Sequence, residues 1–213
     1  LTIDVARFRG PDLLTDLVER DFTINAMAVD LTGDLNLLID PLRGQEDAST
    51  KVLRRCNPAS IASDPIRALR AVRQSTQLTL RIHPETVPDL RAAAPRLLET
   101  SPERVRDELF QILRLDQPAA ALRVADALGL LNVILPELRA LHSLEQPVPH
   151  RLDAWTETLQ IVEKMGVLLK AISPRRSDET AATFGMGMLT IQLDRYRAQL
   201  NEHIDEVHPN QRN

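Results

Sequence analysis

The chain has 213 residues, 43% of them apolar, and a net charge of −4 at pH 7. This length can bury a sizeable core, as one large domain or as two or three small helical ones. The acidic balance excludes a surface that attracts nucleic acid everywhere, so a polynucleotide would have to be held by a local basic patch. No apolar run approaches the roughly 20 residues of a membrane span. The single cysteine, Cys56, excludes a disulfide framework, fits a reducing cytoplasm and is interpreted as inert.

The first third of the chain mixes strand and helix signals. Residues 2–9 alternate between apolar and polar side chains, which predicts a half-buried strand that Gly10-Pro11 ends. Residues 12–31 have a helical pattern in two pieces, and residues 35–39 form a short apolar run after a turn, which predicts a second strand. Because a lone strand needs neighbours, we expect the chain to be part of a longer protein.

After Asn57-Pro58 the strand signals fade and helical periodicity takes over. The pattern predicts helices at about 65–78, 84–93, 102–115, 118–128 and 136–143. Asp64 and Ser101 each precede a proline and are candidate side-chain caps for the helices that follow. Residues 145–150 resemble a linker into a last helical segment. The predicted fold class is therefore α+β and mostly α.

The most specific run of residues is 16–28, which contains Arg20, Asp21 and Asn25. On a helix that begins near Asp21, Asp21 and Asn25 would share a face beside an apolar stripe of Phe22, Ala26 and Val29. One interpretation is a capping aspartate with a buried asparagine that bonds to backbone. The other is that this carboxylate, this amide and the Arg20 fork contact a ribose and a triphosphate.

A second polar cluster surrounds the predicted start of the 65–78 helix. Arg67 and Arg70 are three residues apart and lie close to Asp64. The simplest interpretation is a capping aspartate with two solvated arginines. The functional interpretation is that Asp64 accepts a hydrogen bond from an exocyclic amine while an arginine donates to a ring nitrogen or carbonyl, so that protein side chains select a base.

Four segments together resemble class II CCA-adding enzymes and bacterial poly(A) polymerases. They occur in the family's order: residues 20–26, the Asp40-Pro41-Leu42-Arg43-Gly44 turn with Asp47, residues 64–71, and residues 103–109. The resemblance implies the remnant of a polymerase-β-like nucleotidyltransferase head followed by an all-helical neck and body. The implied domains are a head at 1–57, a neck at 58–116, a body at 117–144 and a helical tail at 145–213. The tail resembles a degenerate start of an HD-like domain.

The resemblance also implies roles for individual residues. Asp4 matches the third catalytic carboxylate, which would help to bind Mg²⁺. The implied nucleotide-binding residues are Arg20 and Asp21, on triphosphate and sugar, with Asn25, and Asp64 and Arg67, on the base, with Arg70. Candidate contacts to tRNA phosphates are the neck arginines Arg91, Arg96, Arg104, Arg106 and Arg114. The paired metal-binding carboxylates, Asp-x-Asp, do not occur in this sequence, so we expect the chain alone not to catalyse transfer.

The chain departs from the family pattern at three places. Glu19 stands where a second phosphate-binding arginine is usual, and Ser63 replaces a glutamate that orients the base-reading arginine. The segment between Arg9 and Asp16 is short, which would suit a CC-adding or single-nucleotide enzyme, although a loop deletion can equally leave specificity unchanged.

The expected function is that of a cytoplasmic RNA 3′-end nucleotidyltransferase that transfers CMP and/or AMP from CTP or ATP to a tRNA 3′ acceptor end. In it this chain would supply base selection and the grip on RNA, with no membrane partner. The alternative is a catalytically inactive RNA-binding or regulatory helical protein derived from the same family.

Overall fold

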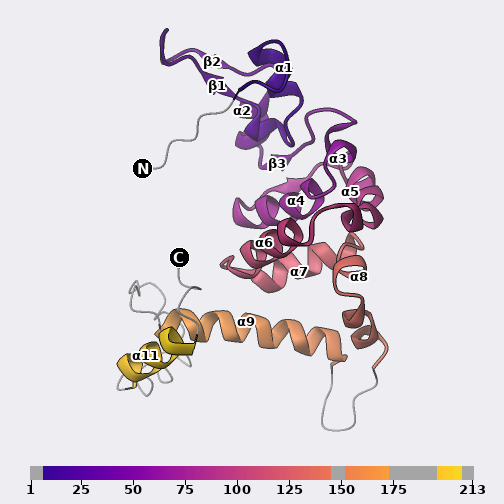
Figure 1. Ribbon diagram of the computed structural model, residues 1–213, viewed down its shortest axis with the longest axis vertical. Coiled ribbons are helices and arrows are strands. Elements are labelled where there is room, and N and C mark those ends of the chain that lie inside the picture. The colour runs from indigo at the N-terminus through magenta and orange to yellow at the C-terminus, as the bar shows by residue number, and fades with distance from the viewer. Residues whose placement is uncertain (1–6, 145–151, 173–195, 208–213) are drawn as a thin grey trace. The chain divides into compact units, whose positions relative to one another are not determined.

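The computed structural model describes residues 7–144, 152–172 and 196–207, and the chain divides into two units, 1–155 and 156–213. In the described part, helices predominate and the strands are short, which confirms the α+β, mostly α class. No helix in these ranges is both long enough and apolar enough to span a membrane. Figure 1 gives the order of the elements. The predicted boundaries at 57, 116 and 144 remain predictions.

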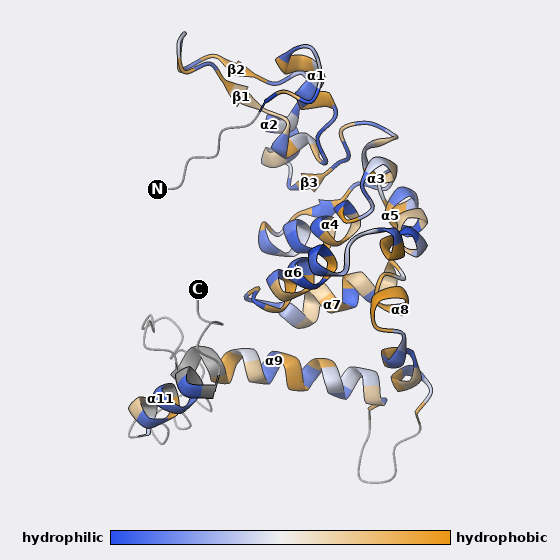
Figure 2. Ribbon diagram, viewed as in Figure 1, coloured by the Kyte–Doolittle hydropathy of each residue, from blue (hydrophilic) through white to orange (hydrophobic). Residues whose placement is uncertain are grey.

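The front of the first unit is built from short elements. They are α1 (Leu13–Val18), the 3₁₀ helix η1 (Thr23–Asn25), β1 (Ala28–Val29), β2 (Leu38–Ile39), α2 (Gly44–Ser49) and β3 (Val52–Leu53). β1 and β2 pair in an antiparallel hairpin, with Ala28 opposite Ile39. This hairpin is apolar yet exposed: Leu31 and Leu37 are 85% and 66% accessible, and both strands are orange in Figure 2.

The helical part of the first unit follows. Its elements are α3 (Ser60–Ser63), α4 (Arg67–Gln77), β4 (Arg81–Ile82), α5 (Val87–Ala93), η2 (Pro95–Glu99), α6 (Pro102–Leu113), α7 (Pro118–Ala127), α8 (Leu131–Ile134) and η3 (Pro136–His142). α4 packs against α5, α6 and α7 (Figure 1). Its buried side includes Ala68, Leu69 and Val72, each fully inaccessible to solvent. α4 is therefore the central helix of this part.

The second unit contains most of α9 (Ala154–Ile172), which begins at the end of the first unit, and α11 (Arg197–Val207). His150 and the start of the predicted HD-like segment lie outside the described residues.

The prediction of a helix that begins near Asp21 is wrong. Phe22 has an extended backbone and forms an isolated antiparallel bridge with Arg55. The Thr23 amide donates to the Arg54 carbonyl at 2.9 Å, and the Cys56 amide donates to the Asp21 carbonyl at 3.1 Å. Pairing with residues 54–56 therefore keeps this backbone extended, and only one 3₁₀ turn follows before β1.

Other expectations about secondary structure are met in part. The strand at 2–9 lies mostly outside the described residues, and residues 7–9 are not a strand. β2 falls inside the expected 35–39 run. The helices expected at 65–78, 84–93, 102–115 and 118–128 are present as α4 to α7, whereas 136–143 is a 3₁₀ helix with no buried residue. Neither Asp64 nor Ser101 caps a helix with its side chain; Asp12 does so for α1.

The turn before α2 is fixed by Asp40 and by Gly44. The Asp40 carboxylate accepts from the backbone amides of Gly44 at 2.7 Å and Gln45 at 2.9 Å, so it satisfies the free N–H groups at the start of α2. A Cβ at Gly44 would lie 2.1 Å from the Thr23 carbonyl oxygen. Glycine is thus required here by the close approach of two backbone segments.

We expect Gly44→Ala to lower the free energy of unfolding by about 1–3 kcal/mol, because the added methyl group collides with backbone that must move. Gly33→Ala is the matched control, since its Cβ would lie 3.4 Å from a flexible Asp30 carboxylate oxygen. Urea unfolding followed by circular dichroism measures both variants. Equal unfolding midpoints for the two variants would contradict the close approach at Gly44.

Candidate functional site

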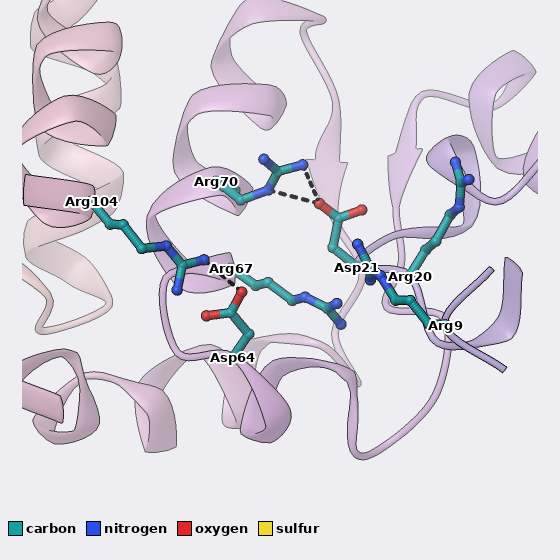
Figure 3. Close-up of a pocket in the computed structure, with 7 residues that line it drawn as sticks. All are labelled: Arg9, Arg20, Asp21, Asp64, Arg67, Arg70 and Arg104. Carbon is teal, nitrogen blue, oxygen red and sulfur yellow. Dashed lines mark hydrogen bonds and ion pairs between the residues drawn. The ribbon is translucent and has the colours of Figure 1, made fainter. Parts of the chain in front are cut away.

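A cavity of about 340 Å³ lies in the first unit where its front meets its helices. Figure 3 shows its polar lining, which includes five guanidinium groups and two carboxylates: Arg9, Arg20, Asp21, Asp64, Arg67, Arg70 and Arg104. An excess of cations in one hollow attracts a polyanion, and arginine forks suit phosphate oxygens. The acidic chain therefore does contain a local basic site.

Asp21 is the buried centre of this site, with 6% of its surface accessible. Its Oδ1 accepts from the Asn25 side-chain amide at 3.0 Å and from the Phe22 backbone amide at 2.9 Å, while Arg70 contacts its Oδ2 at 2.7 Å. Burial alone raises the pKa of the Asp21 carboxyl, but the hydrogen bond from Asn25 and the charge and hydrogen bond of Arg70 outweigh it and lower the pKa. Asp21 is thus held ionised.

Asn25 supports Asp21 and does not line the cavity. Its side-chain amide also donates to the side-chain oxygen Oε1 of Gln74 on α4 at 3.0 Å. Asn25 and Asp21 are therefore neighbours, as the sequence predicted, but through a 3₁₀ turn rather than through one face of an α-helix. The structure contradicts the interpretation in which the Asn25 side chain bonds to the backbone, because its amide donates to two side chains.

Arg20 is held by Asp16, a buried carboxylate that the sequence analysis did not single out. The Arg20 Nε and Nη2 atoms donate to Asp16 Oδ2 at 3.2 and 3.1 Å, and Nη1 donates to the Asn25 carbonyl at 3.0 Å. The other oxygen of Asp16 accepts from the Arg9 backbone amide at 3.1 Å. Asp16 therefore orients the Arg20 side chain and fixes the backbone at Arg9.

Arg67 is buried, which corrects the interpretation of a solvated face. Only 8% of its surface is accessible, and its Nη1 donates to the Ser60 carbonyl at 2.9 Å. The Ser63 hydroxyl donates to the same carbonyl at 2.9 Å. Ser63 and Arg67 therefore share an acceptor, and they form no ion pair with each other. Burial lowers the pKa of Arg67, and the nearby Asp21 charge partly offsets this effect.

Asp64 contacts an arginine from a distant helix. Its Oδ2 accepts from Arg104 Nη2 on α6 at 2.8 Å. The prediction of a side-chain cap at Asp64 is wrong, because the carboxylate bonds to Arg104 and not to the free backbone amides of α4. Arg104, expected among the RNA-binding residues, is therefore part of the cavity (Figure 3).

The other candidate RNA-binding arginines lie away from this cavity. Arg96 pairs with Glu99 and donates to the Ala62 carbonyl, and Arg106 pairs with Asp107. Arg114 lines a second hollow, with residues at the ends of α4 and α6. Arg91 is exposed on α5. Their expected contacts with RNA remain predictions.

The described residues contain no group of three or more histidine, cysteine, aspartate or glutamate side chains placed to hold a metal ion. The two cavity carboxylates each engage an arginine instead, and Asp4, the expected magnesium ligand, lies outside the described residues. Burial raises the pKa of the Cys56 thiol to about 12, which agrees with its interpretation as inert.

Sequence reasoning missed three residues of the site: Arg9, Asp16 and Gln74. The spacing of Asp16 and Arg20, four residues apart, was a signal for their ion pair. Arg9 and Gln74 had no local signal, since each is brought to the site by long-range folding. Glu19, the position of the usual second arginine, is exposed and does not line the cavity, whereas Arg9 does.

Two family models match segments of this chain. Residues 4–54 match the Poly A polymerase head domain, and residues 79–141 match the probable RNA and SrmB-binding site of polymerase A. The two matches together cover more than half of the chain and leave α4 between them.

Three relatives share substantial sequence with the chain. It is 38% identical over 160 residues to the A-adding tRNA nucleotidyltransferase of Deinococcus radiodurans, covering 73% of this chain and 36% of that protein. It is 44% identical over 136 residues to the multifunctional CCA protein of Xylella fastidiosa, covering 62% and 32%. It is 42% identical over 112 residues to the CC-adding tRNA nucleotidyltransferase of Geobacter sulfurreducens, covering 53% and 26%. The chain thus spans about a third of the length of the curated relatives it matches.

Solved structures have the same fold. A CCA-adding enzyme in an apo form matches with a TM-score of 0.60 and 26% identity, over 97% of this chain and 54% of that one. A tRNA-processing enzyme with CTP matches with a TM-score of 0.58 and 26% identity, over 94% and 60%. The fold and the matched head domain are those of a nucleotidyltransferase-type protein. The chain belongs to the tRNA nucleotidyltransferase and poly(A) polymerase family.

Arg70→Met is expected to raise the pKa of Asp21 and to destabilise the fold by about 1–2 kcal/mol, because a buried carboxylate loses a partner that water only partly replaces. The lowered pKa of Asp21 contributes stability that is present above the usual carboxyl pKa and is lost as the pH falls. The gap between wild type and variant should therefore be widest above about pH 5 and shrink in acid.

Urea unfolding at a series of pH values measures that gap. Arg123→Met, which removes an exposed arginine from α7, is the control and should show no such pH dependence. A gap of constant size from pH 3 to pH 7 (about the range over which carboxyl groups titrate) would show that Arg70 does not act through Asp21.

Proposed function

We propose that this chain binds and selects the nucleoside triphosphate in an enzyme that transfers CMP and/or AMP from CTP or ATP to the 3′ end of tRNA in the cytoplasm. The single observation that supports this proposal is the cavity, in which five arginines lie beside the carboxylates of Asp21 and Asp64. The names of the relatives, which add C, A or CCA to tRNA, fit the same proposal.

Within the proposal, the two sides of the cavity have different tasks. Arg9 and Arg20 would bind the triphosphate, since guanidinium forks donate to phosphate oxygens in pairs. Asp21, with Asn25 behind it and Arg70 beside it, would meet the sugar. All of these groups except Arg9 are already held in place by hydrogen bonds among the described residues, which reduces the cost of ordering them on binding.

The base would be selected by Asp64 and Arg67. Cytosine and adenine each carry an exocyclic amine, whereas uracil and guanine carry a carbonyl oxygen at the corresponding position. A carboxylate accepts from an amine and repels a carbonyl oxygen, so Asp64 would favour CTP and ATP over UTP and GTP. Arg67 would donate to the neighbouring ring nitrogen or carbonyl. Whether C, A or both are added is set by further contacts.

Mg²⁺ is the ion that such an enzyme would use, with Asp4 as one ligand. When bound, it would stabilise charge that develops on the transferred phosphate. The described residues do not complete a metal site, so the proposal assigns them to binding and selection alone.

Arg67→Ala is expected to weaken binding of CTP and ATP by about tenfold or more, the loss of one charge-assisted contact, while tRNA affinity changes little. Because Arg67 is buried, Arg67→Gln serves as a second variant that keeps donors and most of the volume. Isothermal titration of each nucleotide into the folded chain, checked by circular dichroism, gives the affinities. Unchanged affinity and unchanged nucleotide preference in both variants would sink the base-selecting role.

The candidate RNA contacts predict a strong dependence of tRNA binding on salt. Each lost phosphate contact lowers the slope of log affinity against log salt by about one. Alanine variants at Arg91, Arg96, Arg106 and Arg114 should each show this decrease in filter binding, whereas Arg123→Ala should keep the wild-type slope. Slopes that match wild type in all four variants would place the tRNA on another surface.

A further inference from the structure

Arg104 stands at the base-selecting end of the cavity rather than on an open RNA surface. It extends from the first turn of α6 and reaches across 40 residues of sequence to Asp64, with an Nη2 to Oδ2 distance of 2.8 Å. Figure 3 shows the two side chains pointing toward each other beside Arg67. From this contact we propose that Arg104 is a positioning residue for nucleotide selection, which orients the Asp64 carboxylate toward the base. This inference rests on the proposed function and deepens it.

Fold stability does not explain the Arg104 to Asp64 pair. The two side chains are 54% and 30% exposed, and ion pairs that water reaches contribute little to the free energy of folding. The pair does, however, fix the direction of a carboxylate that has no side-chain bond to the helix it precedes. Its effect is therefore local, on the geometry of Asp64.

The helix that carries Arg104 is itself anchored to α4. Glu108, one turn further along α6, is buried and contacts Arg73 of α4 at 2.5 Å. Residues four apart share a face of an α-helix, so Arg104 and Glu108 both face α4. This anchor holds the start of the Arg104 side chain in place while its guanidinium reaches Asp64.

The contact engages only one oxygen of Asp64. Arg104 bonds to Oδ2, and among the described residues Oδ1 accepts no hydrogen bond. A carboxylate held through one oxygen presents the other in a fixed direction, where it can accept from an exocyclic amine. Because the Ser63 hydroxyl cannot form an ion pair with Arg67, Arg104 orients the other member of the base-selecting pair, Asp64.

The test compares Arg104→Ala, Arg104→Lys and wild type by isothermal titration with CTP, ATP and UTP. All three nucleotides carry the same triphosphate, so UTP reports binding that does not depend on the exocyclic amine. We expect Arg104→Ala to weaken CTP and ATP by about five- to tenfold, as for the loss of one oriented hydrogen bond, and to leave UTP unchanged. Arg104→Lys, which keeps the charge without the fork, should restore part of the preference.

Arg123→Ala is the matched control, because it removes an exposed arginine from the neighbouring helix α7, outside the cavity. Its nucleotide affinities should equal those of wild type, and the unfolding midpoint of Arg104→Ala should also be unchanged. Equal weakening of CTP, ATP and UTP in Arg104→Ala would overturn the inference, since Arg104 would then contact phosphate. So would wild-type nucleotide affinities combined with a loss of tRNA affinity, which would assign Arg104 to RNA. Failure of the wild-type chain to bind any nucleotide would overturn the proposed function itself.

Discussion

The buried carboxylate of Asp21 is the constraint on which the cavity depends. A carboxylate removed from water must be surrounded by donors, and here they come from segments far apart in the sequence: Asn25 in η1 and Arg70 on α4. Gln74, one turn beyond Arg70, bonds to Asn25 and closes the network. Because these groups must all meet, the first 3₁₀ turn and the central helix are held at one separation. The cavity lies beside this network, and Asp21 and Arg70 line it.

The charges of the cavity are mostly compensated inside the protein. Asp16, Asp21 and Asp64 each hold one arginine, and the Ser60 carbonyl accepts from Arg67. Four of the five cavity arginines are therefore oriented by hydrogen bonds or ion pairs before any ligand arrives. The backbone around Arg9 is fixed by Asp16, while its guanidinium has no hydrogen bond or ion pair within the described residues. A cluster of like charges is costly unless carboxylates are interspersed. The three aspartates therefore allow the arginines to lie close together and still attract a polyanion.

The sequence predicts what is local and fails where distant segments decide. α4, α6 and α7 follow from 3.6-residue periodicity and from prolines at or near their starts, because burial of one helix face leaves that pattern. The helix expected at Asp21 does not form, since residues 54–56 pair with that backbone. The predicted cap at Asp64 fails because Arg104 takes its carboxylate, and the solvated face at Arg67 fails because the start of α4 is covered. The structure brings five of the predicted nucleotide-binding residues into one cavity, Arg20, Asp21, Asp64, Arg67 and Arg70, while their hydrogen-bond partners depend on the tertiary fold.

The division of the cavity between two parts of the chain has a consequence for specificity. Arg9, Arg20 and Asp21 come from the front of the first unit, whereas Asp64 and Arg67 come from the turn into α4 and from α4 itself. Because phosphate and sugar are common to the four nucleoside triphosphates, the proposed function would let the front remain constant while the helical part determines which base is accepted. The ion pair between Asp21 and Arg70 joins the two parts and includes neither of the residues proposed to contact the base. Under the proposed function, a change on α6 that redirects Asp64 would therefore alter base selection while the proposed triphosphate contacts stay in place.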